Sequence, residues 1–495
     1  MGDAPLMLGV SGCRGIVGES LTPDVISRYA GAFGGWLRER HGGKPVTVVL
    51  GRDGRAGGHV VRHAAIAGLC GSGCDVVDLG IETTPTIGVM VDALEADAGM
   101  VLTASHNPQQ WNGMKCLLRE ADECERGGVS ACAPSAQMAA EIVDRFKSGK
   151  NDWQRWDRLG AVTRQRDAAA VHVARVVERF GEDVLTAIAA MKPTVVLDSV
   201  NGAGAHAGRQ LLERMGCRVV QLGAEDTGIF PHTPEPTREN LAGAGGLCEA
   251  VREHGAIVGF AQDPDADRLA VIDERGAYIG EEYTLVLAAS QVIEMGMRGA
   301  ERRSEKVAVN LSTSRMIEDV AGEFGAEVVR TPVGEAHVVQ AMKHADMVIG
   351  GEGNGGVIWS SVTYVRDSLG AMALVLAAIV RANRQVSELV GRVPAYAIEK
   401  RKVTIASKAE AGPAEEKLVA WASGGGGGTD ARIDTQDGVR VDWADREPES
   451  GGSGGGPAWV HVRASNTEPI LRLIGEARTP EGVSSLLDTV AAVVG

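Results

Sequence analysis

The chain is poor in aromatic residues, which make up 4% of its 495 residues, and no apolar run approaches the ~20 residues of a membrane-spanning helix. Basic residues are outnumbered: the formal charge of −15 disfavours binding to the phosphate backbone of nucleic acids. The first residues contain neither the basic segment nor the apolar core of a secretory signal. We therefore expect a cytoplasmic protein that acts on small molecules, with neither a membrane nor a nucleic acid as partner.

The eight cysteines are scattered and include no C-x-x-C pair. Cys70 and Cys74 lie one helical turn apart in an apolar stretch, which favours small buried hydrophobic side chains. Glycine is abundant instead, with 66 residues, and this favours tight turns and close approaches of the backbone. A chain of 495 residues is too long for a single core, so we expect about three to four domains.

A strand, a loop, a helix and a second strand recur three times along the chain, an order typical of α/β folds. In each unit an apolar strand runs into a polar loop before a helix; these strands are Val46–Leu50, Thr194–Leu197 and Val307–Leu311. A later strand also ends in an unusual polar loop; these strands are Gly99–Leu102, Ala256–Phe260 and Met347–Ile349. We interpret the pattern as an internal triplication with one functional loop per copy, at corresponding strand ends.

The residues after Val393-Pro394 have a different character. Glycine-rich segments between 424 and 457, to which we assign no role, flank a short strand, and two further strands precede a final helix. The sequence therefore predicts an α/β protein of four domains with the active site in a central cleft. Three similar mixed α/β domains would cover residues 1–158, 159–278 and 279–394, and a smaller α+β domain residues 395–495.

A candidate nucleophile follows the strand Gly99–Leu102. The segment Thr103-Ala-Ser-His-Asn-Pro108 puts the hydroxyl of Ser105 beside the imidazole of His106, and Lys115 comes a few residues later. The Asn-Pro pair stops the strand. A serine esterase is disfavoured, because Ser105 does not stand in a G-x-S-x-G elbow and no second histidine with a plausible acid partner stands out.

Three aspartates at alternate positions, Asp263, Asp265 and Asp267, follow the strand Ala256–Phe260. In an extended loop alternate side chains share a face, so the carboxylates would converge into an oxygen site suited to Mg²⁺. Carboxylates this close repel one another unless a cation lies between them. An EF-hand is excluded, because its sixth position is not glycine and the strand Leu269–Ile272 follows at once. The alternative interpretation is a solvated acidic turn.

Three further loops carry side chains suited to ligands. Arg14 stands in a glycine-punctuated loop, where a guanidinium can approach a phosphate or a carboxylate. Glu352 and Asn354 lie in a glycine-rich loop and can hydrogen-bond sugar hydroxyls or an amine. The last domain holds a cluster of donors for phosphate oxygens: Arg463, Ser465, Asn466 and Thr467. The respective alternatives are a surface arginine, a flexible connector and a capped turn.

In this order, the motifs resemble those of the α-D-phosphohexomutase superfamily over essentially the whole chain. Thr-Ala-Ser-His-Asn-Pro resembles the family's phosphoserine loop, with Lys115 at the matching distance, and Asp-Pro-Asp-Ala-Asp-Arg resembles its metal loop. Gly-Glu-Gly-Asn-Gly-Gly resembles the sugar-binding loop, and Arg-Ala-Ser-Asn-Thr-Glu-Pro the phosphate loop. Pro234–Leu241, Thr331–Glu335 and the Asn354 loop look most like the archaeal-type phosphoglucosamine/phosphoglucomutase branch.

The resemblance implies an isomerase that interconverts hexose 6-phosphates and hexose 1-phosphates through a 1,6-bisphosphosugar. Ser105 would carry the phosphoryl group, and Lys115 would move the hydroxyl proton with a lowered pKa. Stabilisation of the phosphoryl oxygens falls to Arg14, His106 and Arg268. Mg²⁺ would be held by phosphorylated Ser105, Asp263, Asp265 and Asp267. The sugar and its unreacting phosphate would be bound by Glu352, Asn354, Arg463, Ser465, Asn466 and Thr467.

The resemblance leaves the substrate open: glucosamine phosphate is favoured, with glucose and mannose phosphates as alternatives. A bisphosphate that turns without escaping implies a mobile lid, so we expect hinge motion of residues 395–495. The protein would be a monomer or a homodimer. A phosphatase and a non-catalytic sugar-phosphate-binding protein are the rival interpretations.

Overall fold

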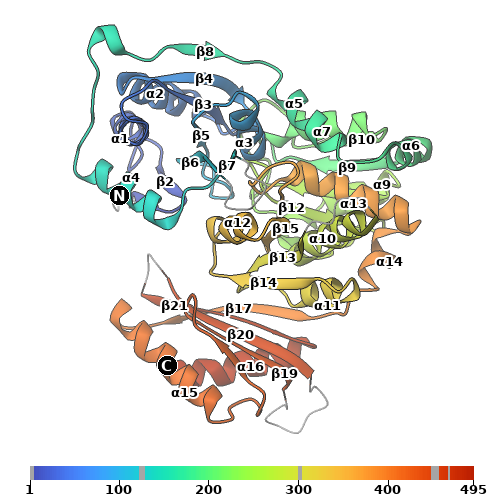
Figure 1. Ribbon diagram of the computed structural model, residues 1–495. Helices are drawn as coiled ribbons and strands as arrows, with labels where there is room; N and C mark the ends of the chain where they lie inside the picture. The colour runs from blue at the N-terminus through green and yellow to red at the C-terminus, as the bar shows by residue number, and fades with distance from the viewer. Residues whose placement is uncertain (1–4, 122–128, 299–303, 447–455, 466–468) are drawn as a thin grey trace.

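The computed structural model describes the whole chain except residues 1–4, 122–128, 299–303, 447–455 and 466–468. Figure 1 shows the first domain, in blue, beside the green and yellow middle of the chain, with the red C-terminal domain at the opposite end. Within the described residues, no helix is both long and apolar enough to cross a bilayer. The α/β class and the four-part organisation are confirmed, since the strands form four separate sheets.

The first sheet has the order β1-β2-β6-β5-β3-β4-β8, and β7 pairs with β6. Its strands are β1 Met7–Gly9, β2 Gly12–Ile16, β3 Val46–Arg52, β4 Cys74–Ile81, β5 Ala98–Leu102, β6 Trp111–Ala121, β7 Val129–Cys132 and β8 Val162–Arg164. The accompanying helices are α1 Pro23–Arg40, α2 Gly58–Gly71, α3 Thr84–Ala93 and α4 Ala136–Lys147. Because β8 pairs with β4, this sheet extends a few residues beyond the predicted boundary at residue 158.

The second and third sheets repeat one topology, β10-β9-β11-β12 and β14-β13-β15-β16. The second is built from β9 Thr194–Asp198, β10 Arg218–Leu222, β11 Val258–Gln262 and β12 Leu269–Ile272, with α5 Ala168–Val177, α6 Glu182–Met191, α7 Gly204–Arg214, α8 Arg238–Leu241 and α9 Leu247–Glu253. The third is built from β13 Ser304–Asn310, β14 Glu327–Thr331, β15 Met347–Glu352 and β16 Gly356–Trp359, with α10 Glu281–Arg298, α11 Met316–Glu323, α12 Glu335–His344, α13 Ser368–Ala382 and α14 Val386–Val390.

The triplication predicted from the sequence is present in the sheets. In each copy the first strand is parallel to two neighbours, and the last strand runs antiparallel at one side: β4-β3-β5-β6, β10-β9-β11-β12 and β14-β13-β15-β16. The Ser105 loop follows β5, the aspartate loop follows β11 and the glycine-rich loop follows β15. These are equivalent positions, so the three loops meet at matching strand ends, where open α/β sheets bind ligands.

One continuous apolar core joins the second and third domains. It contains Val195 and Phe260 from the second sheet, Val309 and Ile349 from the third, and much of the buried helix α13. The side chain of Asp367 caps α13 by accepting hydrogen bonds from the first backbone amides of the helix. The two domains are therefore held as a unit by shared packing rather than by a linker alone.

The C-terminal domain has its own core and an antiparallel sheet of the order β17-β21-β20-β19-β18. Its strands are β17 Ala397–Thr404, β18 Arg432–Asp434, β19 Val439–Arg446, β20 Gly456–Ala464 and β21 Ile470–Ala477, with helices α15 Ala411–Ser423 and α16 Pro480–Val494. The α+β prediction for this region is confirmed.

Two local expectations, a loop at Arg14 and a loop at Glu352, were wrong. Arg14 lies on β2 of a short hairpin and not in a loop, because β1 and β2 pair in an antiparallel register. Lys115 lies within the long strand β6, and Glu352 is the last residue of β15. In each case pairing with a neighbouring strand, which the local sequence does not reveal, orders the backbone.

Polar contacts join the C-terminal domain to the loop after β13. His461 is fully buried on β20; its Nδ1 is 2.9 Å from the Ser312 hydroxyl and its Nε2 is 2.6 Å from the Asp437 carbonyl oxygen. Nε2 therefore carries the proton and Nδ1 accepts one from Ser312. Burial lowers the pKa of His461 from its ordinary value of 6.5 to about 4. The imidazole accordingly remains neutral in the folded protein at mildly acidic pH.

We expect this histidine to make the C-terminal domain less stable in acid. Below pH ~6.5 His461 is protonated in the unfolded chain, but in the folded protein it is protonated only below pH ~4. The free energy of unfolding therefore decreases as the pH falls through this window, by about 2 kcal/mol near pH 5. Urea unfolding followed by the fluorescence of the buried Trp443 and Trp459 should show a smaller loss in His461→Gln. Exposed His254→Gln should behave like wild type; equal losses in all three proteins would refute the assignment.

Candidate active site

Ser105 lies at the start of the loop after β5, almost fully buried at 1% exposure. Its backbone has φ of 51°, a left-handed conformation that is strained for a residue other than glycine. The hydroxyl donates a hydrogen bond to Asp263 Oδ2 at 3.0 Å, and His106 Nδ1 lies 3.4 Å from Ser105 Oγ. The structure thus brings the Ser105 loop of the first domain into contact with the aspartate loop of the second.

Arg55, for which the sequence indicated no role, holds the Ser105 loop in place. Its side chain is wholly buried, and its Nε pairs with Asp53 Oδ2 at 3.0 Å. The guanidinium nitrogens donate to four backbone carbonyl groups of the loop and its exit: Ser105, Asn107, Pro108 and Trp111. Asp53 also accepts from the Thr103 hydroxyl. The only sequence signal was a charged, glycine-flanked segment, Gly51–Arg55, at the end of β3.

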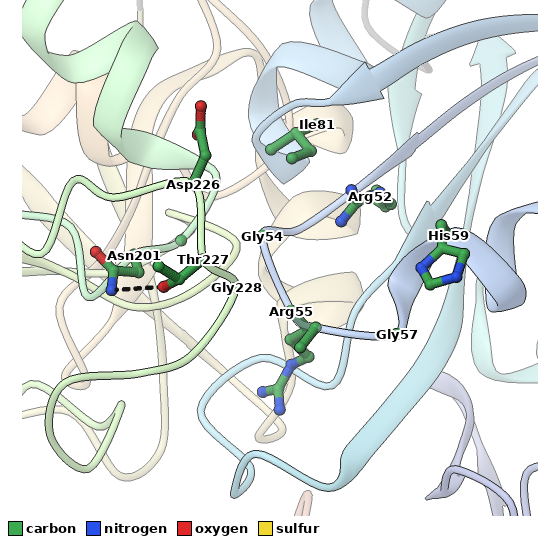
Figure 2. Close-up of a pocket in the computed structure, with 12 residues that line it drawn as sticks. Arg52, Gly54, Arg55, Gly57, His59, Ile81, Asn201, Asp226, Thr227 and Gly228 are labelled. Atoms are coloured by element: carbon green, nitrogen blue, oxygen red, sulfur yellow. Dashed lines mark hydrogen bonds between the residues drawn. The ribbon is translucent and has the colours of Figure 1, made fainter.

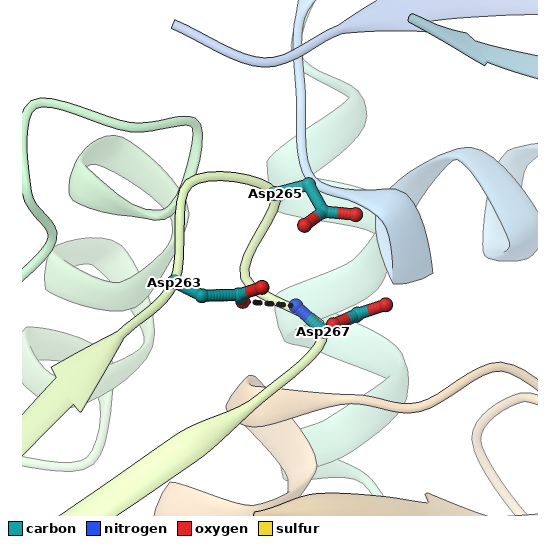
Figure 3. Close-up of side chains that lie close together, drawn as sticks. All are labelled: Asp263, Asp265 and Asp267. Carbon is teal, nitrogen blue, oxygen red and sulfur yellow. Dashed lines mark hydrogen bonds between the residues drawn. The ribbon is translucent and has the colours of Figure 1, made fainter. Parts of the chain in front are cut away.

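The three aspartates converge, as predicted, but not by sharing the face of an extended loop. Asp263, Asp265 and Asp267 lie on a tight turn between β11 and β12, in which Ala266 has φ of 56°. Asp263 Oδ1 accepts hydrogen bonds from the backbone amides of Asp267 and Arg268, each at 3.1 Å, and so closes the turn (Figure 3). The turn, and not strand alternation, directs the carboxylates toward one another.

The geometry of the three carboxylates fits a divalent cation. One oxygen from each lies within 4.8 Å of the others, and all three residues are fully buried. Asp265 Oδ1 and Asp267 Oδ1 are buried without any hydrogen-bond donor within the described part of the chain. Hard oxygen donors of this kind suit Mg²⁺. Asp273, outside the spacing, instead accepts amide hydrogen bonds from Arg275 and Ala277 in a turn.

Lys115 bridges two of these aspartates. Its Nζ lies 2.6 Å from Asp265 Oδ2 and 2.9 Å from Asp267 Oδ2. Burial by itself would lower the pKa of Lys115, but the two carboxylates outweigh it and raise the pKa above its ordinary value. The expected lowering of this pKa by neighbouring cations is therefore wrong: Lys115 is a charged, ion-paired ammonium.

Arg366, also missed from the sequence, connects the aspartate turn with the glycine-rich loop. Its Nη2 donates to Asp267 Oδ2 at 2.6 Å, and its Nη1 donates to Glu352 Oε2 at 2.7 Å. Glu335 Oε2 lies 3.4 Å from Nε of the same guanidinium. Gly356 is required here, since a Cβ atom at that position would lie 2.4 Å from Arg366 Cδ. The sequence offered only an Arg-Asp pair just before α13.

The remaining cationic and imidazole candidates surround the aspartates. Arg14 Nη1 donates to Asn107 Oδ1 at 3.0 Å, and Arg268 Nε lies 3.9 Å from Asp267 Oδ1. The Nε atoms of Arg14 and Arg268 are buried without an acceptor among the described residues. Burial, reinforced by the charges of these two arginines, lowers the pKa of His106 to about 4, so its imidazole is neutral at pH 7.

The two candidate ligand-binding residues of the glycine-rich loop, Glu352 and Asn354, differ in exposure. Glu352 is buried, and its second carboxylate oxygen accepts from Asn310 Nδ2 at 2.8 Å. Asn354 is partly exposed and accepts a hydrogen bond from the Gly356 amide. Gly353 lies against the buried carboxylate of Glu282: a Cβ atom on Gly353 would lie 2.1 Å from the carboxylate oxygens. Glu352 is thus fixed by the protein, while Asn354 remains available to a ligand.

The C-terminal loop is described only in part. Arg463 lies on β20 with Nη1 3.6 Å from Asp437 Oδ2, and Ser465 is buried at the end of that strand. Asn466 and Thr467 lie outside the described residues. The structure thus brings together Ser105, His106, Lys115, Arg14, Arg268 and the three aspartates, while Arg463 contacts its own domain.

A cavity of about 260 Å³ lies at the joint between the first two domains. Figure 2 shows the segment from Arg52 to Gly57 facing Asn201 and Thr227, which are hydrogen-bonded to each other at 3.3 Å. A Cβ atom on Gly228 would lie 2.5 Å from the Gly54 carbonyl oxygen, so the backbones approach closely here. Arg55, which holds the Ser105 loop, also lines this cavity.

Comparison with known proteins agrees with this geometry. Four domain families described as phosphoglucomutase/phosphomannomutase match the chain: the α/β/α domains I, II and III over residues 5–127, 172–276 and 280–396, and the C-terminal domain over residues 407–493. The crystal structure of a phosphoglucomutase/phosphomannomutase family protein from Burkholderia thailandensis superimposes with a TM-score of 0.78 at 25% identity, covering 99% of this chain and 98% of that one.

Two archaeal relatives are similar over nearly their full lengths. A phosphoglucomutase/phosphomannomutase from Thermococcus kodakarensis is 34% identical over 97% of both chains. A probable phosphoglucosamine mutase from Methanopyrus kandleri is 35% identical over 98% of this chain and 97% of its own. The matches agree with the charged, buried site at equivalent strand ends of three repeated domains. This chain belongs to the phosphoglucomutase/phosphomannomutase family, within the α-D-phosphohexomutase superfamily.

Proposed function

We propose that this hexose-phosphate mutase works through a phosphoryl group carried on Ser105, with a hexose 1,6-bisphosphate as intermediate and glucosamine phosphate as the favoured substrate. The observation that carries the proposal is the 3.0 Å hydrogen bond between the Ser105 hydroxyl and Asp263, which puts a nucleophilic oxygen against three buried carboxylates. An isomerase of phosphorylated hexoses needs such a group to accept the phosphoryl group from one end of the sugar and return it to the other.

The transfer balances in atoms and protons. A sugar hydroxyl oxygen bonds to phosphorus while the bond from phosphorus to Ser105 Oγ breaks, and Oγ gains a proton as the hydroxyl loses one. Lys115 is charged at rest because Asp265 and Asp267 raise its pKa. It can therefore protonate the departing Oγ and then take the proton of the sugar hydroxyl, which returns it to the ammonium form. The return transfer uses the same groups in reverse.

Mg²⁺, which Asp263, Asp265, Asp267 and an oxygen of phosphorylated Ser105 would hold, supplies positive charge against the transferring phosphoryl group. The unpartnered buried oxygens of Asp265 and Asp267 support this ligand set. Around it, Arg14 and Arg268 would hold phosphoryl oxygens through their unpartnered donors. His106, neutral at pH 7, would donate one N–H without adding charge.

The sugar would meet Glu352 and Asn354, and its unreacting phosphate would meet Arg463, Ser465, Asn466 and Thr467. A carboxylate at the sugar site accepts equally from an ammonium or a hydroxyl group. Glucosamine phosphate is favoured because the archaeal relative of 35% identity is named a probable phosphoglucosamine mutase. Glucose and mannose phosphates are the alternative, supported by the name of the Thermococcus relative.

The direct test replaces the nucleophile. Ser105→Ala should lose mutase turnover on glucosamine, glucose and mannose 6-phosphates, by at least ~10⁴-fold, because no oxygen remains to carry the phosphoryl group. Its fold should persist, since a single loop hydroxyl contributes little stability. Intact mass should show one added phosphate on wild type and none on the variant. Exposed Ser407→Ala serves as control, and substantial turnover by Ser105→Ala would refute the proposal.

We assign Arg366 a positioning role, because it connects the aspartate turn with the glycine-rich loop. Arg366→Lys keeps the charge but cannot reach Asp267 and Glu352 together, so kcat should fall about 10- to 100-fold and the Mg²⁺ concentration for half-maximal activity should rise. Exposed Arg384→Lys is the matched control. An unchanged Mg²⁺ requirement in Arg366→Lys would contradict the positioning role.

The metal assignment can be checked without catalysis. Mg²⁺ at ~1 mM should raise the unfolding temperature of chelator-treated wild type, because a cation relieves the repulsion of buried carboxylates and stabilises only the folded state. Asp265→Asn should lose most of this shift, and the exposed Asp183→Asn should retain it. A shift of equal size in all three proteins would place the binding elsewhere.

A further inference from the structure

A cavity of about 270 Å³ lies among α10, α11, α13 and α14 of the third domain. Figure 1 shows these helices together on the side of the molecule from which the chain continues into the C-terminal domain. Glu282, in the first turn of α10, touches Gly353 of the glycine-rich loop, whereas the cavity lining begins at Val286, about 6 Å further along the helix axis. None of the candidate active-site residues lines the cavity. The cavity is thus separate from the active site.

Two residues that line this cavity carry buried hydrogen-bond donors without acceptors in the described part of the chain. Gln291 is only 2% exposed, and its Nε2 has no acceptor within the described residues. Arg381 also lines the cavity, and its Nε and Nη1 atoms are buried without an acceptor in the same part of the chain. Leaving buried donors unsatisfied is unfavourable, and native structures rarely do so without a reason. A ligand with acceptor oxygens would satisfy both groups at once.

The rest of the lining defines the body of such a ligand. Eight of the fourteen lining residues are apolar, with Val286, Val320, Phe324 and Leu389 among them. The charged side chains that line the cavity are two carboxylates, Glu294 and Glu323, and two arginines, Arg381 and Arg392. We propose that this cavity binds a small carboxylate with an apolar body, whose oxygens accept hydrogen bonds from Gln291 and Arg381.

The same wall supports the linker to the C-terminal domain. Val393 lines the cavity and packs with Val286, Val320, Phe324 and Tyr396 in one apolar cluster. The Tyr396 hydroxyl donates to Asp319 on α11 at 2.7 Å, and the guanidinium of Arg478, in the C-terminal domain, lies 4.3 Å from the centre of the Tyr396 ring. A carboxylate in the cavity would therefore contact Val393, which packs against Tyr396 at the start of the C-terminal domain. If the proposed mutase function holds, its occupancy alters turnover through the position of that domain.

Binding is tested by calorimetric titration with sodium octanoate, and with octanol as the uncharged match. Wild type should bind octanoate saturably with a Kd of ~1 mM or below and bind octanol more weakly, since the oxygens of the carboxylate meet two donors. Gln291→Leu should weaken octanoate binding about tenfold. Ala378→Phe, which fills the cavity, should abolish it, while exposed Gln137→Leu should change nothing. Absence of saturable binding up to ~10 mM, or equal binding by all variants, would overturn the site.

Turnover is measured over the same range of octanoate concentrations. Saturating octanoate should change kcat at least about twofold in wild type and Gln137→Leu, and leave Ala378→Phe unaffected. Unchanged kcat at saturation would overturn the coupling to the linker. Ser105→Ala should bind octanoate like wild type, so failure of the proposed mutase mechanism and failure of this site give different results.

Discussion

Three buried carboxylates within one turn constrain the rest of the structure. Asp263, Asp265 and Asp267 have no access to solvent, and carboxylates in that condition repel one another and favour protonation. Burial and the two neighbouring aspartates do raise the pKa of Asp263 well above its ordinary value, whereas the cations beside Asp267 lower the pKa of that residue despite its burial. Those cations are Arg366, from the third domain, Lys115, from the first, and Arg268, from the second. The aspartate turn belongs to the second domain, but its charge state depends on all three.

The balance of charge around the turn explains why it can serve a phosphoryl transfer. Arg366 also pairs with Glu352 and Glu335, so the buried cluster includes these two glutamates as well as the three aspartates. Its carboxylates outnumber its cations, which are Lys115, Arg366, Arg14 and Arg268. A divalent cation would reverse that sign, and a phosphoryl group on Ser105 would restore it. A divalent cation and a phosphoryl group together would therefore leave the net charge of the buried cluster close to its value in the protein alone, whereas the phosphoryl group alone would make it strongly negative. This charge balance is consistent with the proposal that a metal ion and a phosphoryl group occupy the site together.

The sequence predicted the parts of this site that are local and missed those that span domains. Ser105, the aspartates and the glycine-rich loop follow apolar strands directly, so strand patterning and turn residues located them. Arg366 is 99 residues from Asp267, and Arg55 is 50 residues from the Ser105 carbonyl group that it holds, and no local pattern records such contacts. The predicted low pKa of Lys115 failed for the same reason: its sign depends on Asp265, 150 residues away.

The triplicated fold also divides its loops by task. The loops after β5, β11 and β15 face the site, whereas those after β3, β9 and β13 act as joints. Arg55 holds the Ser105 loop, the Asn201 side chain binds the segment near Ile229 and its backbone approaches Gly54, and the Ser312 loop holds the C-terminal domain. The C-terminal domain has its own apolar core and meets the loop after β13 mainly through hydrogen bonds, which can be exchanged for water at low cost. The first three domains instead share buried charge, and the second and third also share one core. We therefore expect separation of the parts to be least costly between the C-terminal domain and the other three.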